Sequence, residues 1–101
     1  MNPYESRIRS EEADALFDAI LSLKDRDECY RFFEDLCTIT ELKSIAQRWA
    51  VAKQLDSGET YQQIAQQLSA SSATIGRVNR CLYDGAGGYR LMLDRQRGKE
   101  R

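Results

Sequence analysis

A run of short polar and basic side chains between residues 72 and 80 has the chemistry to bind duplex DNA. Hydroxyl groups can hydrogen-bond to base edges, a missing side chain lets the backbone approach a groove, and guanidinium groups pair with phosphates. Ile75, Val78 and Leu82 recur at helical spacing and leave these groups together on the opposite arc. The candidate DNA-binding residues are Ser72, Ala73, Thr74, Gly76, Arg77 and Arg80, with Gln62 on the preceding helix.

These residues belong to a predicted helix-turn-helix over residues 61–82. Such a unit needs a small residue where its two helices cross, and Ala65 stands there, with Ile64 and Leu68 on the same face. A polar corner over residues 69–71 separates the two helices. Two alternatives stay open: an ordinary pair of core helices, and a pair that docks on another protein without binding specific DNA.

Capping signals indicate the other helices that must position this unit. Ser10 precedes two glutamates and an apolar stripe, and Thr38 with Glu41 fits a capping box, in which each side chain binds the other's free backbone amide. Gly58 is a typical helix terminator. Besides the helix-turn-helix, we expect helices over residues 11–23, 26–37, 38–56 and 89–96. Because no segment alternates like a strand, the predicted fold is all-α with about six helices.

A chain of 101 residues has room for one domain. We expect a flexible N-terminus over residues 1–9, a helical domain over residues 10–95 and a basic C-terminal tail over residues 96–101. The early helices carry apolar stripes that one small subunit could not cover. A homodimer formed through these helices is therefore expected. The residues that need covering are Leu16, Phe17, Ile20, Phe32 and Phe33, together with Trp49.

Composition argues against an enzyme. The chain has no histidine, its carboxylates sit at helix starts or among basic residues, and no glycine-rich phosphate loop or nucleophile elbow occurs. Cys29, Cys37 and Cys81 have no close-spaced pair, so we expect small core residues and neither a zinc site nor a disulfide. We expect no cofactor. An N-terminus without a secretory signal and the lack of a long apolar run predict a cytoplasmic protein with no membrane association.

Charge is distributed unevenly along the chain. Residues 1–70 carry 8 Lys or Arg against 13 Asp or Glu, a balance of −5, whereas residues 71–101 carry 7 against 3, a balance of +4. The basic end contains the predicted recognition helix, so Arg77 and Arg80 are expected to neutralise phosphates. For Arg95, Arg97, Lys99 and Arg101, a solvated tail without a specific role is an equal alternative.

The order and spacing of these features resemble the Trp repressor superfamily, and in particular its YerC/YecD-type branch. The resemblance covers roughly residues 10–95 and is carried by Asp35–Thr38, Gln47–Trp49, Gly58-Glu59 and Ala73–Arg77. It implies an intertwined all-helical homodimer that presents two helix-turn-helix heads to successive major grooves of a palindromic site. It also implies a sequence-specific transcriptional regulator, most simply a repressor.

The same resemblance implies a candidate effector site. Arg48 and Arg77 match the two arginines that hold the corepressor ring in the Trp repressor, and Thr38 matches a threonine near that ligand. Two departures make tryptophan itself a doubtful ligand. Val78 takes the place of a glycine that leaves room for the ring, and Cys81 takes the place of a serine that meets the ligand's amino group. The candidate effector-binding residues are Thr38, Arg48, Arg77 and Cys81.

Overall fold

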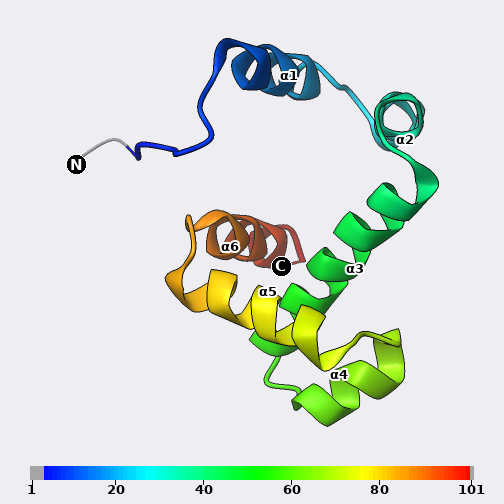
Figure 1. Ribbon diagram of the computed structural model, residues 1–101, viewed down its shortest axis with the longest axis vertical. Coiled ribbons are helices and arrows are strands. Elements are labelled where there is room, and N and C mark those ends of the chain that lie inside the picture. Colours follow the sequence, from blue (N-terminus) through cyan, green and yellow to red (C-terminus); the bar gives the residue numbers. More distant parts are fainter. Residues whose placement is uncertain (1–3, 101) are drawn as a thin grey trace. The chain divides into compact units, whose positions relative to one another are not determined.

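The computed structural model describes residues 4–100, with side chains described as far as residue 98, and this part of the chain forms six helices and no strand. Figure 1 shows their order along the chain. The helices are α1 (Glu11–Leu21), α2 (Arg26–Leu36), α3 (Ile39–Asp56), α4 (Tyr61–Leu68), α5 (Ser72–Asp84) and α6 (Gly88–Glu100). The predicted all-α class and the count of six helices are confirmed.

Side-chain caps set most of the helix starts, as the sequence predicts. The Ser10 side chain accepts a hydrogen bond from the Ala13 amide, and that of Asp25 accepts one from Glu28. At the start of α3, Thr38 Oγ1 accepts from the Glu41 amide at 3.1 Å while Glu41 Oε1 accepts from the Thr38 amide at 2.8 Å. The pKa of Glu41 is lowered, first because the Thr38 amide donates to its carboxylate and then because the Thr38 hydroxyl also favours the charged form.

Two helix ends differ from the prediction. Helix α1 stops at Leu21 because the Ser22 hydroxyl donates to the Ala19 carbonyl at 2.7 Å and the Leu23 amide closes a tighter turn onto Ile20. Helix α6 continues to Glu100, through most of the segment expected as a tail. Its 13 residues contain no proline that would stop the helix. Residues 1–3 of the predicted flexible N-terminus and Arg101 lie outside the described residues.

The chain divides into two compact units, Met1–Leu42 and Lys43–Arg101. In the first unit, α1 and α2 bury none of their residues. Phe32 and Phe33 contact each other edge to face, with ring centroids 5.8 Å apart. Phe17 remains 49% exposed and Leu21 82% exposed. The apolar stripes predicted for these helices are thus present, and they face solvent in a single chain.

The second unit contains the buried core. Figure 1 shows α5 between α4 and α6, in agreement with the contacts that α5 makes with both. The buried residues of this core come from three helices and from the corner between α4 and α5. They are Val51 and Ala52 on α3, Ile64 on α4, Ala70 in the corner, and Ile75 and Val78 on α5. This core fixes the helix-turn-helix on α3. None of the helices in residues 4–100 has the length and apolar character needed to cross a membrane.

Candidate nucleic-acid interface

Helices α4 and α5 form a helix-turn-helix whose inner faces are sealed. Ile64 and Ile75 are fully buried and Val78 nearly so, while Ala65 packs against the same core at the crossing. The corner turns at Ser69, whose φ of 54° is left-handed, and it tucks Ala70 inward. We call residues 60–80, which form this unit, the head.

Two caps and one long-range hydrogen bond hold the head in shape. Thr60 and Gln63 form a reciprocal capping box at the start of α4. At the start of α5, Ser71 Oγ accepts from the Thr74 amide at 3.1 Å and donates to Thr74 Oγ1 at 3.0 Å. The Gln47 side chain of α3 donates to the Leu68 carbonyl at 3.2 Å, which ties the end of α4 to the long helix.

The predicted DNA-binding residues lie on the outer side of this head. Gln62, Ser72, Ala73, Arg77 and Arg80 are exposed, whereas Thr74 and Gly76 are half-buried. A Cβ atom placed on Gly76 would meet nothing within 4 Å, so the chain itself leaves open space at this position. In the first turn of α5 the Thr74 amide is already capped by Ser71. The Ser72 and Ala73 amides have no partner within the helix, because the first amides of any helix lack a carbonyl one turn earlier, and they can bind an acceptor outside it. This surface can therefore hydrogen-bond through hydroxyls, amides and bare backbone.

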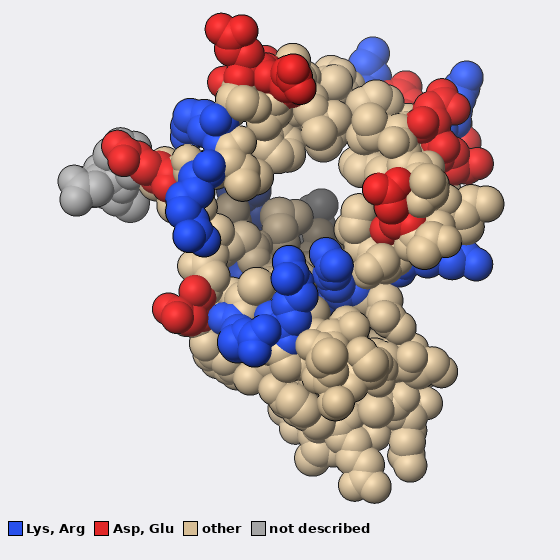
Figure 2. All heavy atoms as spheres, viewed as in Figure 1, with Lys and Arg blue, Asp and Glu red and all other residues tan. Residues whose placement is uncertain are grey.

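Most of the head is free of formal charge. From Thr60 to Gly76 no residue is charged, and Figure 2 shows this part as a lobe of uncharged side chains. Arg77 and Arg80 follow directly on α5. The basic balance of residues 71–101 overstates the charge available for phosphates, because Arg90 and Arg97 pair with Asp56. This pairing gives Arg97, one of the basic residues beyond residue 94, a contact with α3.

A pocket of about 550 Å³ lies in the same unit, beside the C-terminal half of α5. Trp49 and Tyr89 stack in its wall, with ring centroids 6.4 Å apart and planes 15° apart. Burial raises the pKa of Tyr89 and the nearby Cys81 adds to this, while the positive charges of Arg48 and Arg77 oppose it. The lining residues are Ile45, Arg48, Trp49, Cys81, Ala86, Gly88, Tyr89 and Met92.

The pocket brings together only part of the predicted effector set. Arg48 and Cys81 line it, and Arg77 is close enough to act on Tyr89. Thr38 belongs to the other unit. The prediction for Cys81 as a core residue is wrong, because its thiol is free and exposed; those of Cys29 and Cys37 are half-buried. Val78 does not line this pocket, since its side chain fills the core with 1% exposure.

The sequence did not indicate the other residues that line the pocket. Trp49 was expected only as an apolar residue that needs covering, and it is half-buried and faces Tyr89. Ile45 and Met92 are 49% and 41% exposed. A hint lies in the sequence, since Tyr89 and Met92 stand three residues apart on one helix. Their meeting with Trp49, however, depends on how α6 is placed against α3.

Comparison with known proteins identifies the family. The family model described as Trp repressor protein matches residues 11–97. The uncharacterized protein YerC of Bacillus subtilis strain 168 is 53% identical over 94 residues, which cover 93% of this chain and 90% of that protein. A crystal structure of a candidate Trp repressor from Staphylococcus aureus aligns with a TM-score of 0.86 and 49% identity, covering 90% of this chain and 91% of that one.

A crystal structure of a TrpR-like protein from Eubacterium eligens aligns equally well, with a TM-score of 0.86 and 50% identity over 89% of this chain and 93% of that one. The matches extend over both compact units. The resemblance seen in the sequence is confirmed, and it indicates a helix-turn-helix regulator. The chain belongs to the Trp repressor family.

Proposed function

We propose that this protein is a sequence-specific DNA-binding transcriptional regulator that acts as a homodimer, and that it represses transcription by occluding its site. The observation that carries the proposal is the construction of the head. Its inner face is fully buried and capped, while the start of α5 presents exposed Ser72 and Ala73 and the open space at Gly76. A helix of this kind fits the major groove with its N-terminal residues against base edges.

The proposed contacts divide by chemistry. Ser72, Thr74 and the backbone at Gly76 would meet base edges, while Gln62, Arg77 and Arg80 would bind phosphates and fix the register. The Thr74 hydroxyl already accepts a hydrogen bond from Ser71, so its proton is free for an acceptor on DNA. A regulator of this kind acts in the cytoplasmic compartment that holds the DNA.

The homodimer is supported by the exposed apolar side chains of the first unit. Helices as short as α1 and α2, with 11 residues each and no buried residue, are marginal in water unless they pack against a partner surface. A second copy would cover side chains such as Phe17, Leu21 and Leu36, which are 49%, 82% and 47% exposed. Light scattering should give twice the 11.6 kDa of one chain.

A small-molecule effector at the pocket is a secondary proposal. Arg48 would attract an anionic group, and the Trp49–Tyr89 stack offers an aromatic wall. Tryptophan is a poor candidate because the Cys81 thiol is a weak acceptor for its ammonium group. Adding tryptophan to a DNA-binding titration should therefore leave the affinity unchanged.

One observation favours a second candidate function, in which the helix-turn-helix docks on a protein without binding specific DNA. The head carries no charge from Thr60 to Gly76, whereas phosphate contacts supply much of the affinity of DNA-binding proteins. A protein partner would tolerate such a neutral surface.

The two functions separate in one pair of measurements. Duplexes that bind the full chain are selected from a random pool, and affinity for the selected duplex is then measured against rising salt. A regulator should enrich a palindrome and lose affinity with salt, since each pairing with a phosphate releases counterions. Recovery of no common sequence, together with affinity no better than for random duplex, would exclude the proposed function in favour of protein docking.

A further inference from the structure

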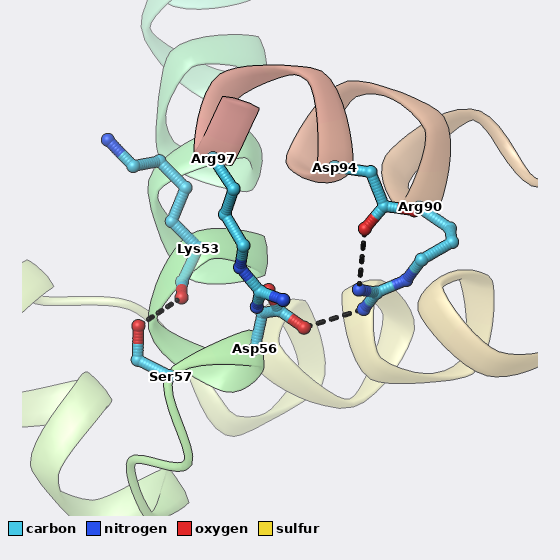
Figure 3. A network of polar contacts seen from close by, with 6 residues as sticks. All are labelled: Lys53, Asp56, Ser57, Arg90, Asp94 and Arg97. Carbon is cyan, nitrogen blue, oxygen red and sulfur yellow. Dashed lines mark hydrogen bonds and ion pairs between the residues drawn. The ribbon is translucent and has the colours of Figure 1, made fainter. Parts of the chain in front are cut away.

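One carboxylate joins the end of α3 to two arginines of α6. The Asp56 side chain is only 12% exposed, and both of its oxygens are engaged. Figure 3 shows Arg90 and Arg97 of α6 reaching this carboxylate. Oδ1 accepts a hydrogen bond from Arg90 at 2.6 Å, and Oδ2 accepts one from Arg97. Arg90 also reaches Asp94 one turn further along α6, at 3.3 Å. Asp56 therefore contacts α6 at two positions that are seven residues, about two turns, apart.

The backbone leading into α6 does not by itself set the direction of that helix. Only residues 85–87 separate α5 from α6, all three are exposed, and Gly87 has a left-handed φ of 86°. Glycine allows many backbone conformations, so the connection can accept several orientations of the next helix. Side-chain contacts must therefore select one orientation of α6. Among the described side chains of α6, such contacts are made by the arginines on Asp56, by the buried Leu93 and by the Tyr89 ring on Trp49.

We infer that Asp56 is a positioning residue that assembles the Trp49 pocket by fixing α6. Helix α6 supplies Gly88, Tyr89 and Met92 to the pocket lining, so the pocket exists only while α6 keeps its place. Without the carboxylate, Arg90 and Arg97 can turn to water, because their side chains are already 41% and 54% exposed. The Arg90–Asp94 pair stays within α6 and supports the helix itself, not its position.

The only tryptophan of the chain reports directly on this arrangement, because it is the ring that Tyr89 covers. We compare Asp56→Asn with Asp94→Asn in the full chain without DNA. Asp94→Asn is the matched control, since it removes a carboxylate paired with the same arginine. In Asp56→Asn we expect the tryptophan band of the near-UV circular dichroism spectrum to weaken and the acrylamide quenching constant of Trp49 to rise about twofold. The far-UV spectrum, which reports helix content, should not change. Asp94→Asn should match the wild type, and Asp56→Glu should restore much of the signal.

The inference goes beyond the proposed function and is tested without DNA, so the two can fail separately. A folded Asp56→Asn variant with wild-type quenching and near-UV signal would overturn it, as would an equal change in Asp94→Asn. If Asp56→Asn does not fold, Arg97→Gln is the variant that tests the inference. It should fold, because Arg97 is the more exposed of the two arginines and the pair between Asp56 and Arg90 remains. That variant should show a smaller rise in quenching, and no rise would overturn the inference.

Discussion

Gly76→Ala should make the protein more stable and weaken its binding to DNA. Gly76 lies inside α5, and a Cβ atom there would meet nothing within 4 Å of the chain. The substitution thus adds a methyl group without a clash. Alanine is favoured over glycine in a helix interior by about 0.8–1.0 kcal/mol, because glycine loses more backbone entropy on folding. For a domain of this size, such a gain raises the melting temperature by about 4–8 °C.

The same methyl group occupies the space through which the α5 backbone would approach a groove. A lost or displaced base contact costs about 1–3 kcal/mol, so affinity for the selected duplex should fall by about tenfold or more. Fluorescence anisotropy with the selected duplex measures the affinity, and thermal unfolding followed by circular dichroism measures the stability. The opposite signs of the two effects separate a direct contact from a general loss of folding.

Gly98→Ala is the matched control for this experiment. Gly98 is an exposed glycine of α6 whose added Cβ would also meet nothing within 4 Å. It should gain similar stability and leave DNA affinity unchanged. If Gly76→Ala binds the selected duplex as tightly as the wild type and Gly98→Ala, then α5 does not approach DNA at Gly76, and the proposed docking of the head is wrong.

Three further outcomes test the charges and the packing around the head. Arg80→Ala should weaken binding to all duplexes and reduce the slope of log affinity against log salt by about one unit per subunit, while an unchanged slope would remove Arg80 from the phosphate contacts. Gly85→Ala should lower the free energy of unfolding, measured by urea denaturation, by about 1–3 kcal/mol, because the new Cβ would collide with the backbone of Cys81. A variant as stable as the wild type would show that this turn can relax around the methyl group. The fold raises the pKa of Tyr89, so above a pH of about 10 the unfolded state loses the Tyr89 proton before the folded state does. The free energy of unfolding should therefore fall as the pH rises through this range. Tyr89→Phe removes the titrating hydroxyl and should make that fall less steep. Equal alkaline slopes in both proteins would contradict this burial of the hydroxyl.

Local signals predicted the fold because they act over a few residues. A cap such as Ser10 or Thr38 binds an amide three residues away, so the sequence alone shows both partners. The end of α1 was misplaced by two residues because the Ser22 hydroxyl competes for a backbone carbonyl, which the apolar pattern does not register. The end of α6 was missed because the predicted boundary followed composition, although no residue there forbids a helix.

The pocket could not be predicted because it depends on contacts between distant residues. Asp56 meets Arg90 and Arg97 across 34 and 41 positions of the sequence, and no periodic pattern links them. In the sequence Arg97 is only one of several basic residues near the C-terminus. Trp49 and Tyr89 each fit an apolar helix face, and only the placement of α6 makes them neighbours.

The neutral head has a consequence for how such a regulator would select its site. Non-specific DNA affinity comes from phosphate pairing, and between Thr60 and Arg80 only Arg77 and Arg80 carry charge. Two cations per subunit give a dimer about four phosphate pairings and a slope of log affinity against log salt near −3.6, from about −0.9 for each. Affinity for arbitrary duplex is then low, so a larger share of binding to the proper site must come from hydroxyl, amide and backbone contacts with bases. A measured slope much steeper than this value would require phosphate contacts from basic residues outside the head.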